Sequence, residues 1–153
     1  LMNSFVGDYS CKLDDKGRVL FPAAFRKQWK GSLDRVILKK DIFEDCIVLY
    51  PMEEWERQLA LIRKKINPYV KEQNQFLREF YRSAAEVELD SNGRMLIPKR
   101  LVEMAGLVKE LVFIGIGDKI EIWDKDKYQT TNMSQEMLAA GAEKFLGGEI
   151  EEL

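Results

Sequence analysis

One ten-residue segment occurs twice in this chain, and the duplication limits the folds that the chain can adopt. The segment at 13–22 reads LDDKGRVLFP and the segment at 89–98 reads LDSNGRMLIP. They lie 76 residues apart and share Leu, Asp, Gly, Arg, Leu and Pro at equivalent positions. A second match follows at 47–50 and 120–123, where the separation falls to 73 residues. Such repeats indicate that the 153-residue chain contains two copies of one structural unit.

Each copy carries the same succession of secondary-structure signals. Apolar and polar residues alternate at its start, which indicates a half-buried strand. Glycine then supplies a tight turn, at Gly17 in the first copy and at Asn92-Gly93 in the second. A return strand ends at Pro22 or Pro98, where proline suits the first turn of a helix. The expected strands are 9–13, 19–21, 36–38 and 47–50, then 87–89, 95–97, 111–114 and 120–123, and the expected short helices are 23–29 and 99–105.

The predicted fold class is α+β, with two β-β-α-β-β repeats. Four short strands leave open edges and one uncovered face, so a single unit is too small to close a core. Two units can complete each other as an intrachain pseudo-dimer, either as a small barrel, the arrangement we expect, or as an interlocked sheet. The connecting helices carry apolar residues that recur at helical spacing. The expected divisions are 5–51 for the first repeat, 52–83 for a helical connector, 84–128 for the second repeat, and 129–153 for a C-terminal helical segment and acidic tail.

The chain contains no histidine, which excludes many catalytic and metal sites. Ser-His-Asp catalysis, Cys-His catalysis and His-ligated zinc all need that side chain. The two cysteines, Cys11 and Cys46, do not form a Cys-x-x-Cys pair, and their apolar neighbours favour buried free thiols. Since the formal net charge is −2, contact with nucleic acid would need a local basic patch. The composition therefore favours a binding protein without cofactor, metal or small-molecule substrate over an enzyme.

The repeated turn carries an aspartate four residues before an arginine, as Asp14 and Arg18 and again as Asp90 and Arg94. Such a pair can support the hairpin as an exposed ion pair, worth about 0–1 kcal/mol. Alternatively, the aspartate orients the arginine, and the guanidinium group points outward at an anionic partner. The residues alone leave both interpretations open.

Several segments of the chain, taken in order, resemble the MraZ family. They are FVGDY at 5–9, LDxKGR at 13–18, PAxFR at 22–26, LYP at 49–51 with EW at 54–55, AAEV at 84–87, LDxxGRxxxP at 89–98 and GIGDKIEIW at 115–123. The resemblance implies AbrB-like swapped-hairpin repeats in a transcriptional regulator of the bacterial division and cell-wall gene cluster. It also implies a ring-shaped homo-oligomer that binds double-stranded DNA. A head-to-tail ring presents one face repeatedly in the same sense, which fits short direct repeats upstream of its own operon.

The resemblance gives three kinds of residue in the two turns a role in DNA binding. These are the arginines Arg18 and Arg94, the aspartates Asp14 and Asp90 that would orient them, and the phosphate neighbours Lys16 and Asn92. Residues 8–30 carry six basic and three acidic side chains, whereas residues 86–103 carry three basic and four acidic ones. One subunit would therefore bind weakly, and linkage of several subunits would raise the affinity by roughly 10²–10⁴.

Two other classes of function stay open at this point. An oligomeric interaction scaffold or antitoxin-like partner would use the arginines to bind protein carboxylates. An enzyme with Asp14 and Asp90 as a carboxylate dyad is disfavoured, because each arginine would keep its aspartate ionised. The first twenty residues carry six charged side chains and lack the apolar segment of a secretion signal. We therefore expect a cytoplasmic protein that does not span a membrane, and the resemblance to a DNA-binding family implies association with the nucleoid.

Overall fold

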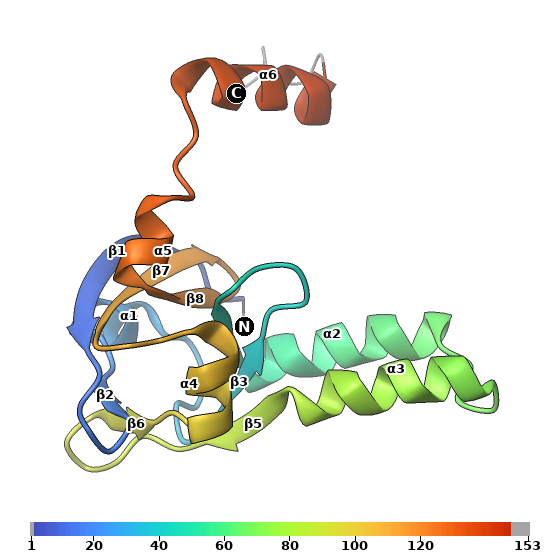
Figure 1. Cartoon of the computed structure of the whole chain (residues 1–153), viewed down its shortest axis with the longest axis horizontal. Coiled ribbons are helices and arrows are strands. Elements are labelled where there is room, and N and C mark those ends of the chain that lie inside the picture. Colours follow the sequence, from blue (N-terminus) through green and yellow to red (C-terminus); the bar gives the residue numbers. More distant parts are fainter. Residues whose placement is uncertain (1, 148–153) are drawn as a thin grey trace.

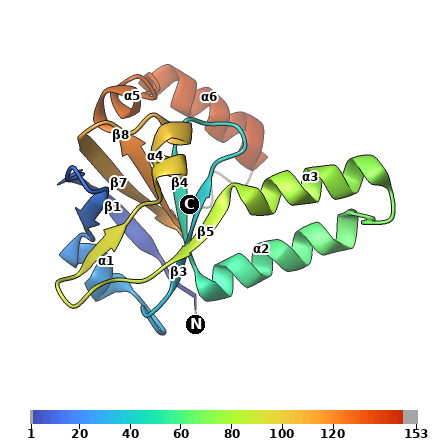
Figure 2. The same ribbon diagram turned by 60° about the horizontal axis from the view of Figure 1, so that its bottom comes forward.

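A six-stranded antiparallel sheet has the strand order β1-β7-β8-β4-β3-β5. It forms the centre of the fold, and the helices surround it or project from it (Figures 1 and 2). The computed structural model describes residues 2–147, so the predicted acidic tail lies outside the described residues. The strands are β1 Phe5–Lys12, β2 Arg18–Leu20, β3 Val36–Lys40, β4 Ile47–Pro51, β5 Ala84–Val87, β6 Arg94–Leu96, β7 Glu110–Gly117 and β8 Ile120–Asp124. The helices are α1 Ala23–Gln28, α2 Met52–Lys65, α3 Lys71–Arg82, α4 Lys99–Ala105, α5 Lys125–Gln129 and α6 Gln135–Leu146.

The strand order is unchanged when the sheet is read from its other edge and the two copies are exchanged. Strand β1 opens the first copy and pairs with β7, the third strand of the second copy. Strand β5 opens the second copy and pairs in the same way with β3 of the first. The last strands of the two copies, β4 and β8, pair at the centre. Each copy thus completes its sheet with strands of the other, as expected of two units too small to fold alone.

The predicted closed barrel is wrong, because the sheet stays open. Among the described strands, β1 and β5 form its two edges, and β2 pairs only with β6 in a separate two-stranded ribbon. At the β5 edge, the Arg100 guanidinium donates hydrogen bonds to the carbonyl oxygens of Arg82 and Ala84. A side chain therefore occupies the Ala84 carbonyl, a backbone acceptor at the free edge of β5.

The first strand of the second copy begins earlier than predicted. Strand β5 covers residues 84–87, and Leu89 forms only an isolated bridge with Met95. The shift has a local cause, because α3 ends at Arg82 and the chain enters β5 almost at once to pair with β3. The chain then leaves the sheet and turns into the ribbon.

Helices α1 and α4 contribute to the main core together with the sheet. Phe25 of α1 and Leu101 of α4 are fully buried. The ring of Phe25 meets those of Phe5 and Tyr9 edge-on, with centroid distances of 5.9 and 5.0 Å. Both cysteines are free, as predicted, but only Cys46 is buried. Cys11, on the edge strand β1, is half-buried.

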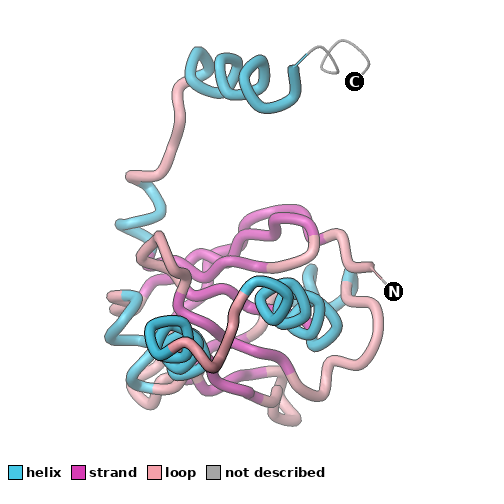
Figure 3. The backbone as a smooth tube through the Cα atoms, turned by 90° about the vertical axis from the view of Figure 1, so that its right-hand side faces the viewer, coloured by secondary structure: helices cyan, strands magenta, loops and turns pink. Residues whose placement is uncertain are grey.

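Two helical parts extend away from the sheet. Helices α2 and α3 lie side by side as a projecting hairpin (Figures 1 and 2). A second apolar cluster joins this hairpin to β3, and within it the rings of Trp55 and Phe80 stack 5.7 Å apart. Helix α6 stands apart from the sheet at the end of an extended connection (Figures 1 and 3) and has no buried residue.

Candidate nucleic-acid interface

The ribbon of β2 and β6 has one buried and one exposed face. Its residue pairs are Arg18 with Leu96, Val19 with Met95, and Leu20 with Arg94. Val19 and Met95 are 1% exposed and belong to the main core. Because side chains alternate along a strand, the other four residues point outward. We call these four the ribbon face: Arg18, Leu20, Arg94 and Leu96.

A tight turn leads into each strand of the ribbon, and the two turns lie at its opposite ends. Gly17 and Gly93 have φ angles of 85° and 79°, a backbone conformation that favours glycine. Each turn is tied to the other copy, because the Ile97 N–H donates to the Gly17 carbonyl at 2.8 Å and the Phe21 N–H donates to the Gly93 carbonyl at 2.9 Å. Main-chain hydrogen bonds between the copies thus fix both turns.

In the first turn, the Asp14 carboxylate holds both the backbone and the arginine. Its Oδ1 accepts hydrogen bonds from the backbone N–H groups of Lys16 at 2.9 Å and Arg18 at 2.8 Å. Its Oδ2 accepts a third from Arg18 Nε at 3.1 Å. The N–H of Arg18 contributes most to lowering the pKa of the Asp14 carboxyl below its ordinary value. The carboxylate is therefore ionised at neutral pH and faces a fixed guanidinium group.

The second turn repeats this arrangement with a looser arginine. Asp90 Oδ1 accepts from the N–H groups of Asn92 at 2.8 Å and Arg94 at 2.9 Å, and the latter hydrogen bond contributes most to lowering the pKa of Asp90. Arg94 Nε lies 3.4 Å from Asp90 Oδ2, which is ion-pair distance without hydrogen-bond geometry. This nitrogen is buried and makes no hydrogen bond with any described residue. The two arginines are therefore equivalent in sequence but are not held equally.

The structure thus brings four of the six predicted site residues together as two Asp–Arg pairs at the ends of one ribbon. The other two, Lys16 and Asn92, are exposed at the turns and use their backbone N–H groups to hold the aspartates. Leu20 and Leu96 share the exposed face with the arginines, and sequence reasoning gave them no role. The signal was present, because both leucines are identical in the two copies of the repeat.

Arg26 of α1 is another residue that sequence reasoning missed. Its Nη2 donates to the carbonyl oxygen of Gly93 at 3.4 Å, so it covers the second turn. The repeat spacing places Val102 at the equivalent position of the second copy. The first turn therefore has no such cover, and it borders a hollow of about 560 Å³ that Val102 lines together with Lys99 and Lys109. The surroundings of the two turns differ accordingly.

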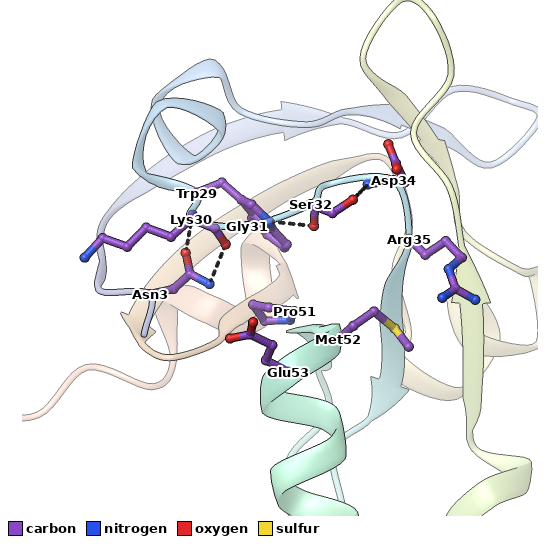
Figure 4. Close-up of a pocket in the computed structure, with 10 residues that line it drawn as sticks. All are labelled: Asn3, Trp29, Lys30, Gly31, Ser32, Asp34, Arg35, Pro51, Met52 and Glu53. Atoms are coloured by element: carbon purple, nitrogen blue, oxygen red, sulfur yellow. Dashed lines mark hydrogen bonds between the residues drawn. The ribbon is translucent and has the colours of Figure 1, made fainter. Parts of the chain in front are cut away.

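A smaller hollow of about 250 Å³ lies between the loop after α1 and the start of α2 (Figure 4). The Lys30 N–H donates to Asn3 Oδ1 at 2.6 Å, and Trp29 Nε1 donates to the Ser32 carbonyl at 3.1 Å. These bonds close the loop and tie it to the N-terminal segment. Within residues 2–147, no group of three or more acidic or cysteine side chains could hold a metal ion. No described helix has the length and apolar character needed to cross a membrane.

Comparison with known proteins identifies the relatives of this chain. The profile of the family described as "MraZ protein, putative antitoxin-like" matches residues 4–79 and again residues 80–147. A protein of Christiangramia forsetii named transcriptional regulator MraZ is 41% identical over 150 residues, which cover 97% of this chain and 96% of that protein. Proteins of the same name are 38% identical in Bacteroides fragilis, over 95% of this chain and 92% of the relative, and 40% identical in Acetivibrio thermocellus, over 88% and 94%. The chain, with its duplicated unit matched twice, belongs to the MraZ family.

Proposed function

We propose that this protein is a sequence-specific DNA-binding transcriptional regulator and that the ribbon face contacts the DNA. The observation that carries the proposal is the pair of Asp-held arginines on one exposed two-stranded ribbon. The major groove of B-DNA admits a two-stranded β-ribbon. The name of the relatives, transcriptional regulator, supports the same conclusion.

The turn residues divide the work of binding. Arg18 and Arg94 present guanidinium groups that donate bidentate hydrogen bonds to guanine edges or phosphates. Asp14 and Asp90 limit the rotation of these side chains, so less conformational entropy is lost when DNA binds. Lys16 and Asn92 stand at the tips of the turns, where they reach the neighbouring phosphates.

Tight binding on this proposal requires several subunits. A net charge of −2 leaves one subunit with little long-range attraction for DNA. We propose a ring-shaped homo-oligomer that presents several ribbon faces in the same sense, and direct repeats upstream of the division and cell-wall gene cluster as its target. This protein would act in the cytoplasm, in association with the nucleoid. The exposed apolar side chains of α6 (Met137, Leu138, Phe145 and Leu146) are available for contacts between subunits.

Fluorescence anisotropy tests the proposal directly. The labelled duplex comes from the region upstream of the gene, and a scrambled duplex of the same composition serves as the reference. Wild type should bind the native duplex more tightly than the scrambled duplex. Arg63→Ala, which removes an exposed arginine from α2, should show the same preference. Arg18→Ala/Arg94→Ala should lose this preference while it keeps its circular dichroism spectrum and assembly mass. Equal, weak binding of both duplexes by wild type and double variant would rule out the DNA-binding function.

The family description favours one alternative, an antitoxin-like partner in which the ribbon face binds protein carboxylates. The same double variant separates the two functions. An antitoxin-like protein would lose its protein partner on Arg18→Ala/Arg94→Ala, with no change in its binding to either duplex.

A further inference from the structure

We infer that Leu20 and Leu96 of the ribbon face contact thymine methyl groups in the major groove and so help to determine which sequence the protein binds. The inference rests on the proposed DNA contact of the ribbon face and adds a base-reading element to it. The arginines alone recognise guanine edges and phosphates, whereas the leucines would select for A·T pairs beside them.

The first support is the exposure of these two leucines on the same face as the arginines. Leu20 is 56% exposed and Leu96 is 54% exposed, although both lie in strands whose other face is 1% exposed. Strand register sets Leu20 opposite Arg94 and Leu96 opposite Arg18. On the ribbon face, two cationic side chains therefore alternate with two apolar ones, and each leucine is the cross-strand neighbour of an arginine.

Both leucines also border open space that a ligand can enter. Leu20 lines a hollow of about 670 Å³ together with Pro22 and Ala23. Leu96 lines the hollow of about 560 Å³ beside the first turn. The same leucine at equivalent positions of both copies thus meets solvent with more than half of its surface, and neither belongs to the buried core of the described fold.

The flanking charges indicate a nucleic acid as the occupant. A purely apolar partner would leave the guanidinium groups of Arg18 and Arg94 without counter-charges beyond their own aspartates, whereas DNA offers both phosphates and guanine acceptors. The C5-methyl of thymine is the apolar group that the major groove displays among these polar edges, and apolar side chains recognise it. A face on which arginine and leucine alternate is complementary to a major groove that displays both polar base edges and thymine methyl groups.

Replacement of thymine by deoxyuridine in the native duplex tests the inference, since it removes only the C5-methyl groups. Wild type should bind the deoxyuridine duplex about three- to fivefold more weakly for each methyl group contacted. Leu20→Ala/Leu96→Ala should bind both duplexes with one affinity and should keep the wild-type salt dependence, because it removes no phosphate contact. Leu20→Met/Leu96→Met, which stays apolar, should retain sensitivity to the methyl groups. Leu61→Ala, an exposed leucine of α2, is the matched control and should behave as wild type.

Each contrary result has a separate meaning. Equal affinity of wild type for the two duplexes, with the arginine dependence intact, would overturn the leucine contacts and leave the proposed function standing. Absence of specific binding to the native duplex would overturn both. A lower assembly mass of Leu20→Ala/Leu96→Ala, with unchanged sensitivity to the methyl groups, would show that the leucines join subunits and would also overturn the inference.

Discussion

Arg26 Nη2 donates a hydrogen bond to the carbonyl oxygen of Gly93, so a side chain of the first copy covers the turn of the second. A Cβ atom at position 93 would overlap this nitrogen, and the φ of 79° is unfavourable for any L-residue with a side chain. Gly93→Ala should therefore lower the free energy of unfolding by the backbone strain, about 1–2 kcal/mol, and by a smaller amount for displacing the flexible Arg26 guanidinium from its hydrogen bond to Gly93. Urea denaturation measures the difference.

Gly31→Ala is the matched control for this prediction. Gly31 has a φ of 89°, yet an added Cβ would meet no described atom within 4 Å. Its substitution should report backbone strain alone. Arg26→Ala should remove the overlap. Gly93→Ala should therefore lower the free energy of unfolding by less in the Arg26→Ala background than in wild type. Equal costs in the two backgrounds would show that Arg26 does not constrain the turn.

Asp14→Asn should weaken DNA binding less than Asp14→Ala. The amide oxygen of asparagine can still accept from the backbone N–H groups of Lys16 and Arg18, so the turn is preserved while the ion pair is lost. Alanine removes all three hydrogen bonds of the carboxylate. Anisotropy titrations of both variants on the native duplex measure the difference, and identical losses would show that the turn itself needs the negative charge.

The pH dependence of this turn follows from the same hydrogen bonds. The pKa of Asp14 in the folded state is lower than the ordinary value of 3.8, chiefly because the Arg18 N–H donates to the carboxylate. The ionised Asp14 carboxylate therefore contributes fully to the free energy of unfolding at any pH above its pKa in the unfolded state. That contribution is lost as the pH falls through the lower pKa of the folded state. Asp90 behaves in the same way. The affinity difference between wild type and Asp14→Asn should thus be constant from about pH 5 to 8; a change within that range would contradict the assignment.

Lys39 should make the stability of the helical hairpin depend on alkaline pH. Its ammonium group lies 4.3 Å from the centre of the Phe80 ring and donates to Ser83 Oγ and the Lys40 carbonyl, and burial lowers its pKa to about 8. Between pH 8 and the ordinary value of 10.5, the unfolded state binds the proton that the folded state has released. The free energy of unfolding due to Lys39 therefore rises with pH across this window.

Comparison of Lys39→Met with wild type separates the effect of Lys39 on stability from that of other groups whose titration lowers the free energy of unfolding as the pH rises. Burial raises the pKa of the Cys11 thiol to about 11 and that of Tyr50 to about 12, so these residues lower the stability as the pH rises. Both are present in wild type and variant alike. The free energy of unfolding of Lys39→Met relative to wild type should fall steadily between about pH 8 and 10. Lys64→Met, which replaces an exposed lysine of α2, is the control substitution. A constant difference for Lys39→Met would mean that Lys39 keeps its proton.

The repeat allowed much of the fold to be predicted, because identical residues at a fixed spacing mark equivalent turns and strands. The turns at Gly17 and Gly93 could be placed because a tight turn needs a residue tolerant of positive φ. The open edge at β5 could not be predicted, since strand pairing across the sheet joins residues that are distant in sequence, as does the contact of Arg100 with the Ala84 carbonyl at that edge. The cover of Gly93 by Arg26 spans 67 residues and breaks the symmetry of the repeat, so no local pattern contains it.

Arg18→Lys/Arg94→Lys should separate base recognition from phosphate contact. Lysine keeps the positive charge, but its single ammonium group cannot form two parallel hydrogen bonds. It also lacks the Nε atom through which arginine can bind the aspartate while its Nη atoms face DNA. If the arginines read guanine, the preference for native over scrambled duplex should fall by about 1–3 kcal/mol per arginine, while the slope of log Kd against log salt stays near the wild-type value. Arg18→Ala/Arg94→Ala should instead lower both the preference and the slope. A lysine variant that keeps the full preference would assign both arginines to phosphates and leave sequence recognition to the other residues of the ribbon.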